Sequence, residues 1–335
     1  MKLIYPFFVK FLSKLSSSTL TFGFLFLTSF SMAQNYPVKP VTIVVPFAAG
    51  GPTDAVARMI AVPMTQFLGQ TVIVENTAGA GGTIGANRVA KANPDGYMIF
   101  LHHVGMSTAP ALYPKLPYDP VNDFEFIGQV VDVPLTLIAR KNIPANNFKE
   151  LEAYLKKNQE KVTMGNAGPG AVSQLCSMLF TNKMGIKLTE VPYKGTGPAM
   201  TDLLGGTIDI MCDQTTNTVA NIRADKVKVF GTTTLKRLKS LPNIPTLDEQ
   251  GFKGFEVVAW HGLYAPKGTP PAVMEKLNAA LKNALANSEI KARLADLSVE
   301  EASAENVSAS GLKKQLESEI KRWTPIIKAA GVTAD

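Results

Sequence analysis

The chain has 335 residues, of which 46% are hydrophobic, and its formal net charge at pH 7 is +7. The first thirty-three residues contain three lysines, and subtracting these from +7 leaves +4 on the rest of the chain. This mild charge excludes a protein with the strongly basic surface that nucleic acid binding requires. A chain of this length can bury two hydrophobic cores, so we expect two domains.

The first thirty-three residues have the pattern of a secretory signal peptide. The lysines come first, an uncharged run follows at 19–30, and Ser31-Met32-Ala33 places small residues at the −3 and −1 positions. We expect cleavage before Gln34. The alternative is a membrane anchor, but the apolar run is too short to span a bilayer comfortably. The sequence lacks the cysteine of a lipid anchor and the Arg-Arg pair of the twin-arginine route, so a mature chain free in the periplasm or outside the cell is predicted.

From residue 36 onward, short apolar runs alternate with stretches of helical periodicity, as in strands that alternate with helices. The first part of the chain predicts strands at 41–45, 71–74 and 97–101 and helices at 53–68 and 83–91. Thr53 is well placed to be the N-cap of the first helix, and Pro63 is expected to bend that helix. Four prolines interrupt residues 110–132, which are therefore predicted to form a loop-rich connection.

The apolar segment 135–139 starts a second series of alternating elements. The pattern predicts helices at 148–157, 171–182 and 198–204, strands at 162–164, 189–191, 208–212 and 255–264, and short elements at 219–224 and 228–231. Long amphipathic helices are predicted at 271–286 and 306–330. Because these two helices have no strands of their own, we expect them to pack on the first sheet.

The order of the elements predicts an α/β protein of two doubly wound lobes. Lobe 1 would comprise residues 34–133 and 260–335, and lobe 2 residues 134–259. The chain would then cross between the lobes near 132–135 and again near 257–262. Two crossover segments between two lobes form a hinge.

Four predicted strands end in a glycine-rich turn that leads directly into a helix, at 47–54, 79–83, 165–170 and 193–197. The start of such a helix presents unpaired backbone N–H groups and the positive end of the helix dipole, which favour an anion. Ligands of open α/β sheets lie outside the carboxyl ends of the strands, where these turns occur. Two turns belong to each lobe, so an anion held between the lobes is predicted. The alternative is that the glycines only permit tight turns and close packing.

The candidate donors to a carboxylate ligand come from both lobes. Lobe 1 would contribute the amides of Ala49, Gly50, Gly51, Ala80, Gly81 and Gly82 with the hydroxyl of Thr53, and lobe 2 would contribute Asn166, Ser173, Gly195 and Thr196. The polar run 213–217 follows a predicted buried strand. It is either a specificity loop, which binds the non-anionic part of the ligand or an ordered water, or a helix-capping run. Asp213 would repel a carboxylate, so it would act through water or contact an amine.

No catalytic or cofactor motif is complete. The sequence lacks a G-x-S-x-G elbow, an H-E-x-x-H pair and a P-loop, and the glycine spacing at 79–85 departs from the dinucleotide fingerprint by one residue. Of the three histidines, His102 and His103 are neighbours that would point to opposite faces of a strand, so no metal site and no cofactor are expected. His103 is expected to face the cleft. An exported hydrolase or lyase that uses His103 or His261 is the enzymatic alternative.

The two cysteines fall in different predicted elements, Cys176 in a helix and Cys212 at the end of a strand. In an oxidising compartment they could form a disulfide. The alternative of two buried free thiols stays open, because sequence alone sets no geometry.

Several short segments, taken together in their order along the chain, indicate a protein family. They include P-F-A-A-G-G-P-T-D at 46–54, G-A-G-G at 79–82, V-P-Y-K-G at 191–195, D-L-L-G-G at 202–206 and W-H-G-L at 260–263. In order and spacing the chain resembles the Bug family, the extracytoplasmic solute receptors of tripartite tricarboxylate transporters. The match extends over nearly the whole mature chain and is far more specific than any single glycine motif.

The resemblance implies a type II periplasmic-binding-protein fold whose lobes close on a small organic carboxylate, with a dicarboxylate or an aromatic acid favoured. Backbone amides and bridging waters would hold the ligand. By position, Phe47, Gly50, Gly51 and Thr53 would be first-loop contacts and Ala80 to Gly82 second-loop contacts, with Asn166, Ser173, Gly195 and Asp213 facing them.

The resemblance also implies a monomer without enzymatic activity that passes its ligand to the large and small membrane subunits of the transporter. A carboxylate sensor that feeds a signalling system is the alternative. The glycine-rich turns contain no arginine and a single lysine, Lys194, so the sequence does not identify the carboxylate.

Overall fold

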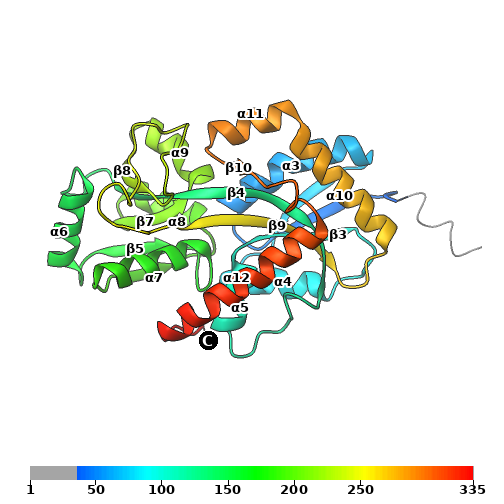
Figure 1. The fold of residues 1–335 in the computed structure, drawn as a ribbon, viewed down its shortest axis with the longest axis horizontal. Coiled ribbons are helices and arrows are strands. Elements are labelled where there is room, and N and C mark those ends of the chain that lie inside the picture. Colours follow the sequence, from blue (N-terminus) through cyan, green and yellow to red (C-terminus); the bar gives the residue numbers. More distant parts are fainter. Residues whose placement is uncertain (1–35, 335) are drawn as a thin grey trace, which may run out of the picture. The chain divides into compact units, whose positions relative to one another are not determined.

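The computed structural model describes residues 36–334 (Figure 1). The predicted signal peptide and its cleavage site lie outside these described residues. From Lys39 onward the chain forms one compact unit, and the short described stretch before it contains a cis peptide bond between Tyr36 and Pro37. Within 36–334, no helix combines the length and the apolar character that a membrane crossing requires.

The first of two sheets has the strand order β2-β1-β3-β9-β4. Its strands are β1 (Val41–Val45), β2 (Val72–Asn76), β3 (Met98–His103), β4 (Phe124–Arg140) and β9 (Val258–Pro266). The strands β1, β2 and β3 are parallel, and β9 lies antiparallel between β3 and β4. Side chains of β1 and β3 are buried on both faces, as in a parallel sheet that helices cover on both sides.

The long strand β4 belongs to both sheets. Its residues from Phe124 to Pro134 pair with β9, whereas those from Leu135 to Arg140 pair with β7 and β8. The second sheet has the order β8-β4-β7-β5-β6, with β5 (Thr163–Asn166), β6 (Thr189–Pro192), β7 (Ile210–Gln214) and β8 (Val227–Thr232). The two sheets have the same arrangement. In each, three parallel strands come first (β2-β1-β3 and β6-β5-β7), an antiparallel strand follows (β9 and β4), and one more strand completes the sheet (β4 and β8). We name the elements on the first sheet lobe 1 and those on the second sheet lobe 2.

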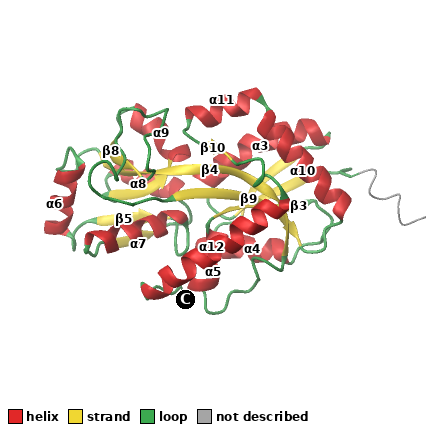
Figure 2. Ribbon diagram, in the orientation of Figure 1, coloured by secondary structure: helices red, strands yellow, loops and turns green. Residues whose placement is uncertain are grey.

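Helices cover both sheets (Figures 1 and 2). Lobe 1 carries α3 (Pro52–Leu68), α4 (Thr83–Ala90), α5 (Gly105–Leu112), α10 (Pro271–Ala286), α11 (Ser288–Asp296) and α12 (Ala309–Ala329), and lobe 2 carries α6 (Phe148–Asn158), α7 (Val172–Met184), α8 (Thr196–Gly205) and α9 (Thr215–Arg223). α10 contacts α3 and β4, and α12 contacts α5 and β4, so the C-terminal helices pack on the first lobe as predicted. α11 and the short strand β10 (Glu300–Glu301), which pairs with β4, were not predicted.

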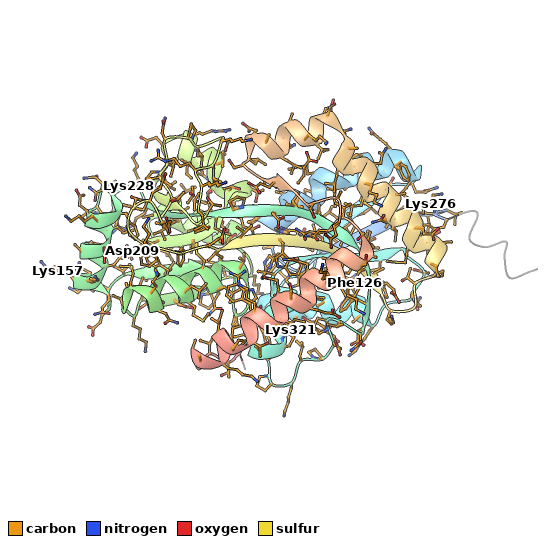
Figure 3. All side chains as sticks on the ribbon, viewed as in Figure 1. Phe126, Lys157, Asp209, Lys228, Lys276 and Lys321 are labelled. Carbon is orange, nitrogen blue, oxygen red and sulfur yellow. A yellow bond between two sulfur atoms is a disulfide. The ribbon has the colours of Figure 1, made fainter. Side chains whose placement is uncertain are left out.

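Polar side chains fasten the second half of β4 to lobe 2. Asp209, just before β7, accepts hydrogen bonds from Arg140 Nε at 2.7 Å and from the amide of Thr163 at 2.9 Å. Lys228 of β8 donates to carbonyl oxygens of the segment 143–145, which follows β4. Figure 3 shows Asp209 and Lys228 in the part of the molecule that is built on the second sheet.

The predicted loop-rich connection over 110–132 is confirmed for 113–123 and wrong at its two ends. α5 contains Pro110, and β4 begins at Phe124, shortly after the last proline of this region, Pro120. Phe124 and Phe126 are buried, and both pair with β9. Burial of aromatic side chains on a sheet favours a strand, and here it outweighs the prolines that precede it.

The predicted N-cap of α3 is also wrong. Gly51 is the N-cap and Pro52 the first helical residue, because the fixed φ of proline suits that position. Thr53 therefore lies inside the first turn of the helix, with its side chain buried.

The two cysteines form a disulfide that joins α7 to β7. Cys176 and Cys212 have Cα atoms 6.1 Å apart and are separated by 36 residues along the chain. The structure thus answers the question that the sequence left open. Closing a loop of this length stabilises the fold by about 4 kcal/mol in the chain-entropy account.

Candidate ligand-binding site

A small cavity lies where the four glycine-rich turns meet. Its volume is about 190 Å³, and it is lined by Phe47, Gly79, Ala80, Gly81 and Gly82 from lobe 1 and by Ala167, Gly168, Pro169, Pro192, Tyr193 and Lys194 from lobe 2. All four turns contribute to this lining. The tertiary structure therefore brings together the four segments that the sequence marked as anion-binding candidates.

The first turn (47–51) is held by Asp54 in the first turn of α3. The Asp54 carboxylate accepts hydrogen bonds from the amide of Gly50 at 3.0 Å, from Arg58 Nε at 2.9 Å and from Asn76 Nδ2 at 3.0 Å. Burial works to raise the pKa of Asp54, but these hydrogen bonds outweigh it and lower the pKa, so the group is ionised. The predicted donor Gly50 is thus already paired within the protein.

The first and fourth turns are in direct contact. The amide of Ala48 donates to the carbonyl oxygen of Lys194 at 2.8 Å, which joins lobe 1 directly to lobe 2. A Cβ atom added to Gly197 would lie 3.1 Å from the amide nitrogen of Gly51 and 3.2 Å from the carbonyl oxygen of Ala49. Glycine at position 197 therefore allows the two backbones to come this close.

Several predicted donors remain unpaired. The amides of Ala49, Gly51, Ala80, Gly81, Gly195 and Thr196 have no acceptor in the part of the chain that the structure describes. Gly82 is different, because its amide donates to the carbonyl oxygen of Gly79 at 2.9 Å. Of these residues, Ala80 and Gly81 line the cavity at the start of η1 (Ala80–Gly82), and unpaired amides in such a position are suited to an anionic ligand.

Asn166 and Ser173 accept hydrogen bonds from backbone amides of the third turn. Ser173 Oγ accepts a hydrogen bond from the amide of Ala167 at 2.9 Å, and Asn166 Oδ1 accepts one from the amide of Gly168 at 2.9 Å. Both side chains are buried, and neither lines the cavity. In this structure they shape the turn that carries Ala167 and Gly168 into the lining.

Asp213 is fully buried at the end of β7. It accepts hydrogen bonds from Thr196 Oγ1 at 2.8 Å and from Asn217 Nδ2 at 2.6 Å. Burial raises the pKa of Asp213 to about 6, and the hydrogen bonds from Asn217 and Thr196 oppose that rise. The polar run 213–217 is the end of β7 and the start of α9 rather than a loop, and a contact between it and the ligand stays a prediction. Asp213 does not line the cavity and instead anchors the start of α8.

The three histidines of the sequence form a cluster of rings that contacts Phe47. His103 of β3 is paired with His261 of β9, and the centroids of these two rings are 5.8 Å apart. The rings of His102 and His103 are 4.8 Å apart, and Phe47 stacks on His103 at 4.8 Å. Thr53 Oγ1 lies 3.3 Å from His261 Nε2. No pattern in the sequence signals this cluster, because it depends on the antiparallel pairing of β3 with β9.

The histidine cluster is neutral. Burial lowers the pKa of His102 and of His261 to about 3, and it also lowers the pKa of His103 well below its usual value. His103 is not among the residues that line the cavity in this structure, and its Nδ1 accepts a hydrogen bond from the amide of Gly105 at 3.0 Å. Residues 36–334 contain no group of three or more His, Cys, Asp or Glu side chains that could hold a metal ion.

Sequence reasoning missed Tyr193 as a lining residue, although it lies in the V-P-Y-K-G segment. Tyr193 lines both the cavity and a second hollow of about 540 Å³, which Ala49, Gly50 and Asp202 also line. Its hydroxyl donates to Asp202 Oδ2 at 2.6 Å. Burial and Asp202 together raise the pKa of Tyr193 to about 12, so the phenol stays protonated and keeps this contact.

The sequence profile of the tripartite tricarboxylate transporter family receptor matches residues 56–332. The chain belongs to this family. Its members are solute-binding receptors rather than enzymes, which confirms the prediction that the chain has no enzymatic activity. The family also explains why the site contains unpaired amides and neutral imidazoles rather than a nucleophile with an adjacent base.

Three solved structures are similar to the receptor along most of its length. The periplasmic binding protein BugD is 51% identical with a TM-score of 0.87, and the match covers 90% of this chain and 100% of that one. MatC from Rhodopseudomonas palustris, solved with malate, is 41% identical with a TM-score of 0.84 over 87% of this chain and 100% of that one. Another Rhodopseudomonas palustris protein, solved with adipate, is 31% identical with a TM-score of 0.84 over 89% of this chain and 99% of that one.

These likenesses confirm the predicted fold class. The receptor has the type II periplasmic-binding-protein fold, with two doubly wound lobes joined by crossover segments. Its cavity lies at the carboxyl ends of the parallel strands of both lobes, which is where ligands of open α/β sheets bind.

Proposed function

We propose that this receptor closes on a small organic carboxylate in the periplasm and delivers it to a tripartite tricarboxylate transporter. One observation carries the proposal: unpaired backbone amides, those of Ala80 and Gly81 foremost, border a cavity between the two lobes. A carboxylate offers acceptors to several N–H groups at once, and hydrogen bonds with a charged partner are stronger than neutral ones. Bridging waters would complete the contacts.

The size of the cavity supports a short acid. About 190 Å³ lies below the roughly 300–1,000 Å³ of pockets for drug-sized ligands. The two similar receptors solved with malate and with adipate hold aliphatic dicarboxylates. We therefore place a dicarboxylate ahead of an aromatic acid for this chain.

The hinge is proposed where the chain crosses between the sheets. The crossing segments are neighbours, since Asp132 pairs with Trp260 and Pro134 pairs with Val258. Lobe 1 would then comprise 34–133 and 260–335, and lobe 2 134–259. Rotation about this pair of strands would open the cavity between the turns.

The proposed partners are the large and small membrane subunits of the transporter, with the receptor acting as a monomer after cleavage before Gln34. A pull-down with cross-linking in membranes of the source organism tests this assignment. Recovery of transporter subunits supports it, whereas recovery of a signalling ectodomain alone would favour a sensor role.

Ligand binding is tested by thermal unfolding and calorimetry with a panel of carboxylates. A ligand at a hundred times its Kd stabilises the folded form by about 2.7 kcal/mol, which raises Tm by several degrees. The panel should include malate, adipate, an aromatic acid and a tricarboxylate, with the corresponding amides as controls. If no acid raises Tm or gives heat, and native mass spectrometry finds no bound acid in the purified protein, the carboxylate assignment fails.

A further inference from the structure

Two hydroxyl groups of lobe 1 reach across to the third glycine-rich turn, in lobe 2. Thr108 of α5 donates from Oγ1 to the carbonyl oxygen of Gly170 at 2.8 Å. Tyr113, just after α5, has its hydroxyl 3.2 Å from the carbonyl oxygen of Pro169. These carbonyl groups belong to adjacent residues of the third turn, so α5 and the residue that follows it contact lobe 2 at two neighbouring points.

Both donors also have an acceptor within their own lobe. Thr108 Oγ1 lies 3.3 Å from the carbonyl oxygen of Gly105, and the Tyr113 hydroxyl lies 2.8 Å from that of Ala80. When the lobes separate, each hydroxyl can still donate to its acceptor in lobe 1. The carbonyl oxygens of Pro169 and Gly170 can then accept hydrogen bonds from water. Opening therefore leaves no buried donor unpaired, which makes the contact reversible at low cost.

The backbone of Gly170 also lies close to side chains of α5. A Cβ atom at Gly170 would lie 2.9 Å from Leu112 Cδ1 and 3.2 Å from Thr108 Oγ1. Gly170 also has a φ of +82°, which other residues rarely adopt. Glycine at this position therefore lets α5 seat against the turn.

These hydroxyl groups belong to residues outside the lining of the cavity. Neither Thr108 nor Tyr113 lines the cavity, whereas their partners Ala80 and Pro169 do. The Ala48 to Lys194 hydrogen bond joins the lobes through the first and fourth turns, and the α5 contact joins them through the second and third. The lobes are thus fastened by two separate pairs of turns that line one cavity.

We propose that Thr108 and Tyr113 are positioning residues that clasp the Pro169–Gly170 turn in the closed state and set how long the ligand stays bound. The proposal rests on the proposed receptor function for its ligand readout. The clasp acts on closure and not on ligand choice, since its hydroxyls do not border the cavity. Each neutral hydrogen bond contributes on the order of five-fold to the closed population.

The test uses Tyr113→Phe, Thr108→Val and the double variant. Spin labels at Lys157→Cys on α6 and Lys276→Cys on α10 report the distance between the lobes by pulsed electron resonance, and Figure 3 shows both positions. The described residues contain no free cysteine that would interfere. Distances are measured without added acid and with malate and adipate as probes, and dissociation is followed by stopped flow.

The double variant should shift the distance distribution towards the open form. Dissociation of a bound acid should accelerate by about ten- to thirty-fold, since the two five-fold effects combine. The association rate and the Tm without acid should stay close to those of the wild type. Thr108→Ser retains the hydroxyl and should restore slow dissociation.

Tyr118→Phe is the matched control, because Tyr118 is a buried tyrosine whose hydroxyl has no partner among the described residues. The clasp is overturned if the double variant keeps wild-type distances and dissociation, or if Tyr118→Phe has the same effect. A wild type with no closed population under any condition also overturns it. If neither acid binds but the double variant still shifts the acid-free distances, the clasp stands and the proposed ligands fail.

Discussion

The backbone of Gly81 in lobe 1 passes so close to Pro169 in lobe 2 that a Cβ atom at Gly81 would lie 1.8 Å from the Pro169 carbonyl oxygen. A non-bonded carbon and oxygen cannot approach this closely. Glycine at position 81 is therefore a condition for closure of the lobes, as well as for the φ of +60° at this position.

Gly81→Ala should leave the fold intact and abolish tight ligand binding. The strain of alanine at positive φ costs about 1 kcal/mol, but the clash with Pro169 forces the lobes apart. Calorimetry with a bound acid should show at least a hundred-fold loss of affinity. Gly185→Ala is the control, because Gly185 has a similar φ of +65° and open space around its Cβ position. Equal losses of affinity in the two variants would refute the claim that glycine at position 81 is needed for the lobes to close.

Lys194→Gln should weaken binding by less than about five-fold. Among residues 36–334, Lys194 is the only cation that lines the cavity, but it is exposed, and exposed charge pairs contribute about 0–1 kcal/mol. The amides are expected to supply most of the affinity. Titrations at low and high salt check this, since loss of a dominant ion pair would abolish the salt dependence. A loss of a hundred-fold or more would place Lys194 at the centre of the site.

The three histidines should remain neutral in the folded protein down to about pH 5. Burial lowers the pKa of His102 and His261 to about 3, whereas unfolded histidine titrates near 6.5. A folded-state pKa below the unfolded one means that the stability contribution is complete above about pH 6.5 and is lost as pH falls. Each such imidazole should cost about 2 kcal/mol between pH 7 and pH 5. Nitrogen NMR of the imidazoles gives the check, and a midpoint near pH 6.5 would contradict the burial.

Asp132→Asn should stabilise the protein increasingly as pH rises. Burial, reinforced by the nearby charges of Glu300 and Glu319, raises the pKa of Asp132 to about 7, and a hydrogen bond from Gln129 opposes the rise. The folded state thus binds a proton that the unfolded state releases near pH 4, so Asp132 lowers stability as pH rises from about 4 through 7. The advantage of the variant should grow by about 3 kcal/mol between pH 5 and pH 8. Urea unfolding at the two pH values measures it, and a constant difference would show that Asp132 ionises normally.

Removal of the disulfide should lower stability without affecting the binding site. The double variant Cys176→Ala, Cys212→Ala opens a loop of 36 residues, which costs about 4 kcal/mol in the chain-entropy account. Neither cysteine lines the cavity, so ligand affinity at 25 °C should change little. Guanidinium unfolding gives the stability, and the reduced wild type should approach the value of the double variant. Equal stability of oxidised and reduced wild type would show that the bond does not contribute.

Local patterns explain why much of the architecture could be predicted. β1 and α3 follow from an apolar run, a glycine-rich turn and a helical stripe that are contiguous in sequence. The start of β4 at Phe124 could not be predicted in the same way, because its burial depends on β9, which lies more than a hundred residues later. A run of prolines gave the stronger local signal and pointed to a loop.

The amino-acid sequence by itself determined the alternating α/β order and the four glycine-rich turns at strand ends, because these depend on periodicity and on local backbone freedom. Only the tertiary structure decided which of the predicted donors stay unpaired. The amide of Gly50 is taken by Asp54 and that of Ala48 by Lys194, whereas those of Ala80 and Gly81 remain available beside the cavity. Hydrogen-bond partners across the seam are set by how two lobes pack, and no local pattern contains that information.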